Sequence, residues 1–348
     1  MRNPKSNTSK HGQQTERVNT ISSVRDIFPR ANTIVSIEDS KLLRQPQYEL
    51  LYSAEGLDAA LKELDDINYF RTYKAARPDN YITLLDSLMY ETLGLLYEIT
   101  PVQDIWRMFA LSHDIHNMKL AVKERQLGLD FESLSLGGGN YSFITMRSAA
   151  VRATDNILKN ETLTKGLNEA LYPRGETVDA VLDKTYFRVL LEFAKQLKIP
   201  TIIAFVIDRI DLYNISAFLQ TQVNDKPLFF EMVFSESGTV PIDQWQAHIM
   251  AVRRGWRLAD DLQFLRQFSP LLQGSEEEIL AFFDIRVDNY LIEQSKAAKL
   301  MAFGIEPICA YFFNKLMEIK NARTLLAGKK HGFSTAEIEK RMRITYDL

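Results

Sequence analysis

Apolar residues recur every three or four positions over most of this chain, which is the spacing of one face of an α-helix. Three of these amphipathic stretches open with a proline in the first turn, where its missing N–H costs least. Pro101, Pro200 and Pro307 occupy these positions, and each stretch runs for more than twenty residues. The pattern predicts three long helices within an all-α fold.

Capping signals indicate where two of the long helices begin or end. Thr100 and Gln103 have the spacing of a capping box, which places the start of the first long helix at this point. We expect Gly128 to end that helix, and Gly328 to end the third one as a left-handed cap. The second long helix has no equally clear end signal.

Shorter elements are predicted between and after the long helices. Ser275 with Glu278, and Ser334 with Glu337, form two further capping boxes and predict helix starts at both places. An amphipathic segment near the start carries Leu57, Leu61, Leu64 and Ile67. The apolar runs TIVSI near residue 33 and PLFFEMVF near residue 227 fit either a strand or a short buried helix.

The three long helices contain the same polar pair, an acid three residues before an asparagine. The pairs are Asp114 with Asn117, Asp211 with Asn214, and Glu318 with Asn321. A second marker lies upstream, because Asp86 precedes Asn117 by 31 residues and Asp183 precedes Asn214 by the same 31. A looser copy at Asp284 precedes Asn321 by 37 residues. Such self-similarity indicates one helical unit of about a hundred residues that occurs three times.

The repeat divides the chain into a polar, disordered tail (1–30) and three helical units (31–140, 141–240 and 241–348). In each unit the acid and the asparagine share one helix face. Burying the asparagine without a partner would cost roughly 1 to 3 kcal/mol, so we expect each one to have a partner. The pairs could tie the helices of each unit together, or they could form the polar lining of a central pocket that receives a partner.

Charge and cysteine content exclude several classes of protein. Lys plus Arg is 42 and Asp plus Glu is 45, so the net charge of −3 provides no basic field for binding nucleic acid. The single cysteine, Cys309, cannot form an internal disulfide and fits a reducing, cytoplasmic compartment. The longest apolar stretch, 199–207, is far shorter than the roughly 20 residues that a membrane-spanning helix needs. A basic cluster near the end comprises Lys329, Lys330, Lys340, Arg341 and Arg343, and these side chains could face an acidic partner or stabilise helix ends.

No residue pattern here is typical of an enzyme's active site. His113 and His116 have a spacing that could place two imidazoles on one metal, but no further His or Cys lies near them in sequence. The run Gly137–Gly139 lacks the Lys and Ser or Thr of a phosphate-binding loop, and we expect a flexible link there. We therefore predict no catalytic, metal or cofactor residues.

Two aspartate pairs leave one enzymatic alternative open. Asp65 with Asp66, and Asp260 with Asp261, resemble the magnesium-binding helices of isoprenoid-diphosphate enzymes. Both motifs lack the last carboxylate of that pattern.

Five segments, in order along the chain, resemble the C subunit of V-type ATPases, the bacterial and archaeal relative of the eukaryotic d subunit. They are TIVSIEDSKLL, LDSLMYETLGLLYEITP, VLDKTYFRVL, IDLYNISAFLQ and EPICAYFFNKLMEIKNARTLLAGKKHGFSTAEIEKRMR. The resemblance covers residues 30 to 345 and rests on diffuse helical patterns in a matching order.

The resemblance implies a funnel-shaped protein with three helical units around a pseudo-threefold axis. Such a protein caps the proteolipid rotor ring on the cytoplasmic face of the membrane and seats the central-stalk subunits of the ATPase head. It carries torque from ATP hydrolysis to H⁺ or Na⁺ transport without catalysis of its own, and touches the membrane only through the ring. A soluble scaffold outside any ATPase remains the nearer alternative to this interpretation.

Overall fold

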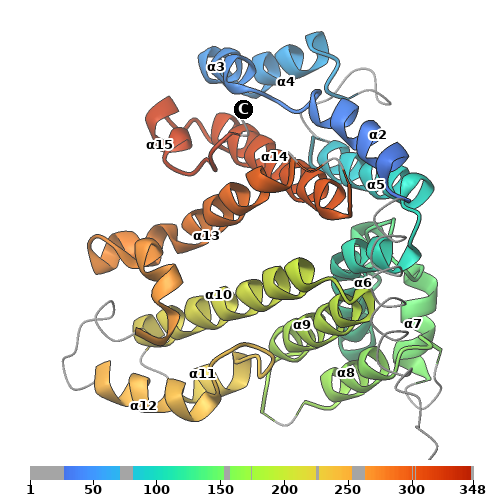
Figure 1. The fold of residues 1–348 in the computed structure, drawn as a ribbon, viewed down its shortest axis with the longest axis vertical. Helices are drawn as coiled ribbons and strands as arrows, with labels where there is room; N and C mark the ends of the chain where they lie inside the picture. The colour runs from blue at the N-terminus through green and yellow to red at the C-terminus, as the bar shows by residue number, and fades with distance from the viewer. Residues whose placement is uncertain are drawn as a thin grey trace, which may run out of the picture.

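The computed structural model describes residues 27–70, 81–152, 157–173, 175–224, 227–252, 263–299, 301 and 303–345 (Figure 1). The longer helices are α5 (Tyr81–Ile99), α6 (Gln103–Leu127), α9 (Val178–Leu197), α10 (Pro200–Asn224), α13 (Glu276–Lys299) and α14 (Glu306–Lys330). The shorter ones are α2 (Pro29–Asp39), α3 (Gln45–Ser53), α4 (Gly56–Asp66), η2 (Glu132–Leu134), α7 (Phe143–Val151), α8 (Glu161–Leu171), α11 (Pro227–Val233), α12 (Ile242–Val252), η3 (Gln263–Leu272) and α15 (Thr335–Glu339). Within these ranges every regular element is helical, which confirms the all-α prediction.

The three predicted long helices are α6, α10 and α14, each of 25 residues. Helix α10 begins at Pro200, and Pro307 lies in the first turn of α14, as predicted. Gly128 ends α6 with a φ of 68°, a left-handed conformation that a side chain would disfavour. The capping boxes at Ser275 and Ser334 are also present, each with its glutamate three residues on.

The predicted capping box at Thr100 is wrong. Helix α5 runs to Ile99, and the Thr100 N–H donates to Leu96 O at 3.0 Å, so Thr100 closes the preceding helix. Helix α6 begins at Gln103, with Val102 as its N-cap and no side-chain cap. Pro101 and Val102 therefore form a short linker between the two helices.

The predicted left-handed cap at Gly328 is also wrong, because α14 continues to Lys330. A Cβ on Gly328 would lie 2.6 Å from Ile338 Cγ1, so this glycine lets α15 pack closely against α14. Gly332 takes the left-handed conformation instead, with a φ of 71°. Close packing, rather than chain reversal, explains the glycine at 328.

The two apolar runs that fitted either strand or helix are both helical. TIVSI lies in α2 and PLFFEMV forms α11. The amphipathic segment near residue 60 is α4, with Leu61 and Leu64 buried. No helix within the described ranges is both long and apolar enough to cross a membrane.

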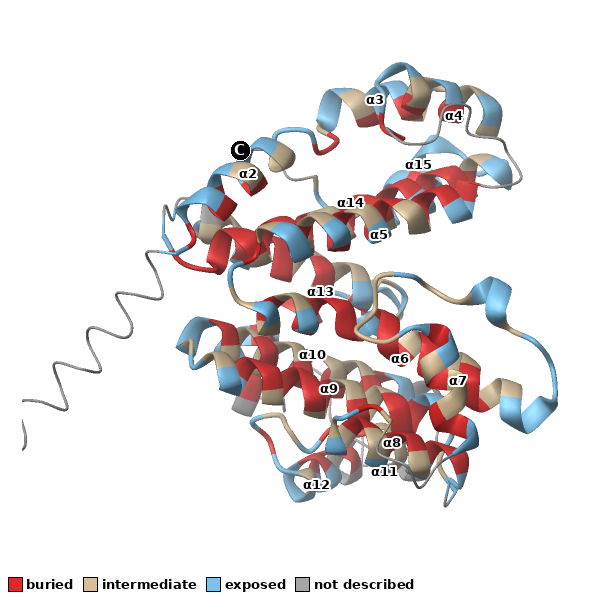
Figure 2. Ribbon diagram, turned by 90° about the vertical axis from the view of Figure 1, so that its right-hand side faces the viewer, coloured by how far each residue is buried: buried red, intermediate tan, exposed pale blue. Residues whose placement is uncertain are grey.

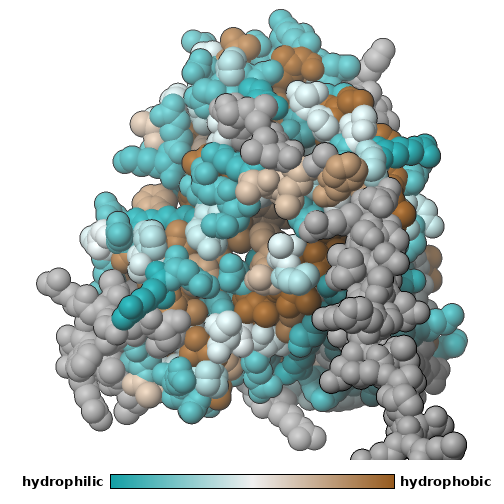
Figure 3. All heavy atoms as spheres, viewed as in Figure 1, coloured by the Kyte–Doolittle hydropathy of each residue, from teal (hydrophilic) through white to brown (hydrophobic). Residues whose placement is uncertain are grey.

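When the helices are grouped into the three units predicted from the sequence, the long helices pack against helices of neighbouring units as well as their own. Within units, α5 packs on α6, α9 on α10 and α13 on α14; between units, α6 packs on α9, α10 on α13 and α14 on α5. The N-terminal helices α2 and α4 also pack on α14, above the rest of the molecule in Figure 1. Buried residues follow these contacts between helices (Figure 2). The face in Figure 3 is polar around its outside and hollowed near its middle, where more apolar side chains lie.

Candidate functional site: three side-chain clamps on the long helices

Each repeated asparagine binds both the backbone N–H and the backbone C=O of one residue. Asn117 Nδ2 donates to Leu136 O at 2.7 Å, and Asn117 Oδ1 accepts from Leu136 N at 2.9 Å. The same two bonds join Asn214 to Ser235, at 3.0 and 2.9 Å, and Asn321 to Arg343, at 3.1 and 2.8 Å. All three asparagines are buried. Each therefore holds the segment that follows its long helix, in a geometry that satisfies both polar atoms of the amide.

In the first two units the acid holds the same segment a few residues further on. Asp114 accepts from Tyr141 N at 3.1 Å and from Asn140 Nδ2 at 2.6 Å. Asp211 accepts from Thr239 N at 2.8 Å and from Thr239 Oγ1 at 2.6 Å. Acid and asparagine together thus fix two points of one loop, and we call this arrangement a clamp.

Glycines allow the loop backbone to approach these carboxylates. A Cβ on Gly139 would lie 2.6 Å from Asp114 Oδ1, and a Cβ on Gly238 would lie 2.4 Å from Asp211 Oδ1. Neither distance leaves room for a side chain. The run Gly137–Gly139 is consequently not the flexible link predicted from the sequence, because it lies against α6 within the first clamp.

The third clamp differs in its acid and in the origin of its partner. Glu318 Oε2 accepts from Leu43 N at 2.5 Å, so this carboxylate holds the N-terminal part of the chain. It also pairs with Lys315, one turn earlier on α14. Glutamate, one methylene longer than aspartate, reaches a segment that approaches from another part of the fold.

Burial dominates the electrostatics of the first two clamps. It raises the pKa of Asp114 to about 7, against the opposing effect of the hydrogen bonds from Asn140 and Tyr141. Burial likewise raises the pKa of Asp211. The clamp carboxylates therefore hold protons more tightly in the folded protein than in the unfolded chain.

Asp114 should make the protein less stable as the pH rises. The pKa of Asp114 is about 7 in the folded protein and lower in the unfolded chain. At pH values between these two pKa values, the folded state therefore binds more protons than the unfolded state. Between pH 5 and pH 8 this group should remove about 2 kcal/mol of unfolding free energy. Urea unfolding across this range should show that loss in the wild type but not in Asp114→Asn. The control Asp104→Asn, at a more exposed position of the same helix, should lose stability with rising pH as the wild type does. If the unfolding free energies of the wild type and Asp114→Asn change equally with pH, Asp114 is not the group responsible.

The two histidines of α6 also bind the first clamp's loop. His113 Nδ1 lies 2.6 Å from Gly137 O, and His116 Nε2 lies 3.0 Å from Leu134 O. Burial lowers the pKa of His113, so the neutral ring with its hydrogen on Nδ1 donates to that carbonyl. No group of three or more His, Cys, Asp or Glu side chains suited to a metal occurs among the residues that the structure describes. Of the aspartate pairs considered for magnesium, Asp260 and Asp261 lie outside the described residues.

Two of the three upstream markers, Asp86 and Asp183, lie at contacts between units. Lys119 Nζ on α6 is 2.6 Å from Asp183 Oδ1 on α9, and Arg323 Nη2 on α14 is 2.6 Å from Asp86 Oδ1 on α5. Lys119 and Arg323 each follow their clamp asparagine by two residues. These partly exposed pairs contribute little stability, but they place equivalent helices in equivalent contacts.

The first halves of the long helices meet through aromatic side chains. Phe109 of α6 stacks on Phe312 of α14 with ring centroids 4.3 Å apart, and Phe205 of α10 meets Phe313 edge to face at 6.0 Å. A cavity of about 130 Å³ lies between α10, α13 and α14, lined mainly by apolar groups. The centre of the molecule is thus apolar, whereas the clamps lie further along the helices.

Most of the C-terminal basic cluster has contacts within the chain. Lys329 Nζ donates to Tyr52 O and Ala54 O, at 2.7 and 2.6 Å, and Lys330 Nζ lies 5.6 Å from the centre of the Tyr81 ring. Arg343 Nε donates to Asp288 Oδ2 at 2.9 Å, and Arg341 Nη1 donates to Glu337 O at 3.2 Å. Lys329, Lys330 and Arg343 thus contact other parts of the fold, whereas Arg341 bonds the end of its own helix, α15.

The six residues singled out from the sequence lie in three separate clamps, and each acid and asparagine has its own backbone partner. Sequence reasoning missed those partners, as well as the role of Leu43. The sequence did contain a signal for the loops that Asp114 and Asp211 hold. A glycine that allows close approach to the carboxylate lies at a similar spacing in both, because Gly139 follows Asp114 by 25 residues and Gly238 follows Asp211 by 27.

Within its described residues the chain is an all-helical protein whose long helices hold other segments of the backbone through repeated side-chain clamps. In comparison with known families, residues 31–341 match the family described as ATP synthase (C/AC39) subunit, and the chain belongs to that family. This is a non-catalytic subunit of its complex, so the predicted family and the non-enzymatic nature of the chain are confirmed. Membership also excludes a scaffold unrelated to an ATPase and the diphosphate-enzyme alternative.

Two curated relatives match nearly the whole chain. The C subunit of the V-type sodium ATPase of Enterococcus hirae is 25% identical over 333 residues, covering 92% of this chain and 99% of the relative. The C subunit of the A-type ATP synthase of Methanocaldococcus jannaschii is 22% identical over 370 residues, covering 90% of this chain and 86% of the relative.

Proposed function

We propose that this chain caps the proteolipid rotor ring of a V-type ATPase on the cytoplasmic face of the membrane and seats the central stalk. It turns with the rotor and carries torque from ATP hydrolysis in the soluble head to the ring, where H⁺ or Na⁺ moves. Its contact with the membrane is indirect, through the ring, and nucleic acid is not a partner. No residue of the chain takes part in chemistry, and it needs no cofactor.

The observation that carries this proposal is the order of contacts between units. Helix α6 of the first unit packs on α9 of the second, α10 of the second on α13 of the third, and α14 of the third on α5 of the first. Such a cyclic order fits three units around a pseudo-threefold axis, which would give the funnel shape. The clamps in all three units support the same arrangement.

A cap of this kind needs stiffness more than flexibility. Each of the first two clamps ties one loop to a 25-residue helix at two points, and the third ties two separate segments to α14. Aromatic contacts join the first halves of these helices. In this proposal the six clamp residues are internal pegs rather than contacts to the stalk: five act within a unit, and Glu318 joins the third unit to the first. Relatives named as ATPase and ATP synthase subunits support assignment to a rotary complex.

Affinity purification tests the assignment to the rotor. An epitope-tagged chain purified from mildly solubilised membranes of its own cells should bring down proteolipid, central-stalk and catalytic head subunits together. A covalent cross-link from this chain to the stalk should leave ATP-driven ion transport intact, because both turn as one body. Purification without ring or head subunits, or transport blocked by that cross-link, would contradict the proposal.

A further inference from the structure

A groove of about 780 Å³ lies beside α2, and large apolar side chains at its walls are exposed. Phe303 is 57% exposed, Ile37 54% and Met301 41%. We call it the α2 groove; it is lined by α2, the turn after it, Arg44, Met301, Phe303 and the start of α14. Exposed apolar residues normally occur singly, so three around one groove indicate a binding surface.

The two walls of the α2 groove are joined to each other. One wall is α2 itself, and the other comprises Met301, Phe303 and the start of α14. Asn32 Nδ2 on α2 donates to Gly304 O at 3.0 Å in a buried hydrogen bond, and α2 also packs directly on α14. The groove is therefore formed in the folded chain, and an occupant need not rearrange it.

The α2 groove offers apolar contact rather than charge. The Thr33 hydroxyl donates to Pro29 O at 2.9 Å, so its hydrogen is bound within its own helix. Asp39 and Arg44 lie at the end of α2 with their charged atoms 4.0 Å apart, and their opposite charges largely cancel. An occupant should accordingly bind through apolar side chains, because their removal from water supplies the free energy.

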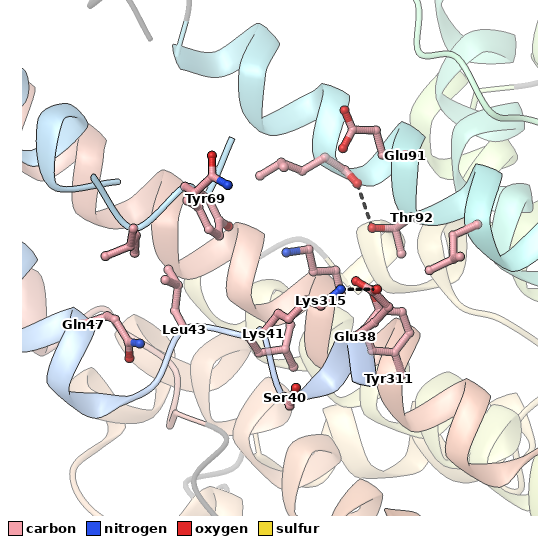
Figure 4. A pocket seen from close by; sticks show the side chains of 15 residues that line it. Glu38, Ser40, Lys41, Leu43, Gln47, Tyr69, Glu91, Thr92, Tyr311 and Lys315 are labelled. Carbon is pink, nitrogen blue, oxygen red and sulfur yellow. Dashed lines mark hydrogen bonds and ion pairs between the residues drawn. The ribbon is translucent and has the colours of Figure 1, made fainter. Parts of the chain in front are cut away.

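A second cleft, of about 770 Å³, differs in this respect (Figure 4). It shares Ser40 and Tyr311 with the α2 groove, but Glu38, Lys41 and Lys315 also line it. Glu38 and Lys41 pair there at 2.5 Å. An apolar segment in this cleft would remove charged groups from water, which costs free energy. Of the two clefts, the α2 groove is the one that suits an apolar occupant.

The chain supplies a segment of suitable character directly before α2. Residues 1–26 lie outside the described residues and lead into that helix. Within them Val18, Ile21 and Val24 recur at every third position, whereas residues 2–17 contain no Ile, Leu, Val or Phe. On a helix these three side chains would span about 120° and share one face. The apolar part of this segment thus lies next to the groove in sequence.

The segment is also long enough to lie along the groove. Helix α2 has 11 residues and is about 16 Å long. From Val18 to Val24 the chain spans roughly 9 Å as a helix and about 20 Å when extended. Because the segment is covalently joined to α2, its effective concentration at the groove is high, and a few apolar contacts suffice to hold it.

We propose that residues 18–24 fold back into the α2 groove and cover Ile37, Met301 and Phe303. The segment keeps this apolar surface away from other proteins. The match to the family begins at residue 31, so the occupant belongs to the part of the chain outside that match. The inference does not depend on the proposed function, since it concerns a contact within one chain.

Photo-cross-linking of the full-length chain tests this contact. With p-benzoylphenylalanine in place of Ile21, irradiation should join position 21 to Met301 or Phe303 within one chain, as peptide mass spectrometry will show. The same probe in place of Thr8, in the polar part of the segment, should give at least about fivefold fewer cross-links to the groove. Cross-links that join two chains would assign the groove to a second copy. That result, or no cross-link from position 21 to the groove, would overturn the proposal.

Oxidation of Met301 by hydrogen peroxide gives a second reading. Ile21→Asp places a charge in the apolar segment and should raise the oxidation rate of Met301 by about threefold or more, because the side chain becomes accessible. The matched control Ser22→Asp adds the same charge at a neighbouring polar position and should leave that rate unchanged. Met342 serves as the internal reference in both proteins. An unchanged rate in Ile21→Asp, or an equal rise in Ser22→Asp, would refute docking through the apolar side chains.

Discussion

Asn214→Asp is expected to lose about 3 to 5 kcal/mol of unfolding free energy, although the two side chains have nearly the same size. Asn214 Nδ2 donates to Ser235 O, and an aspartate would place a carboxylate oxygen against that carbonyl oxygen. The site is fully buried, so water cannot screen the repulsion. Guanidinium unfolding at pH 8, where the new carboxylate is least easily protonated, should show the loss as a lower midpoint.

Asn289→Asp is the matched control for this variant. Asn289 uses its Oδ1 to accept from Ile344 N at 2.8 Å, and aspartate keeps that acceptor. The side chain is only partly buried, so its stability should change by about 0.5 kcal/mol or less. An Asn214→Asp protein as stable as this control would show that the doubly bonded amide is not needed in the second clamp.

Gly166→Ala should cost about 3 kcal/mol through steric overlap at the crossing of α8 and α9. A Cβ at position 166 would lie 2.2 Å from Thr185 Oγ1, 2.5 Å from its Cγ2 and 2.8 Å from its Cβ. Thr185 is 1% exposed and fixed by a hydrogen bond to Val181 O, so it cannot turn away. Thermal or chemical unfolding of the purified chain should show the loss.

Two companion variants identify the cause of that loss. Gly166→Ala with Thr185→Ala removes the two closest atoms and should recover at least about half of the lost stability. Gly94→Ala lies in the middle of α5 with nothing within 4 Å of the new Cβ, so it should be neutral or more stable by about 0.5 to 1 kcal/mol. A double variant no more stable than Gly166→Ala alone would refute steric overlap as the cause.

The all-helical class, the three long helices and most helix starts could be predicted from the sequence because local rules determine them. Apolar spacing specifies a helix regardless of what it packs against, and Pro200, Ser275 and Ser334 act within one turn. The same rules failed at Gly328, because a glycine inside a helix can serve a distant neighbour. There it makes room for Ile338, which no local pattern reveals.

The sequence by itself also determined that an acid and an asparagine recur at one spacing in three helices, and that a buried amide would need a partner. The tertiary structure decided which partners they have. Asn117 and Asn214 bind backbone groups, which carry no side-chain signature, and the chain supplies a peptide group at almost every position. Glu318 illustrates the limit most clearly: its partner, Leu43, lies 275 residues away, and only packing of the N-terminal helices on α14 brings the two together.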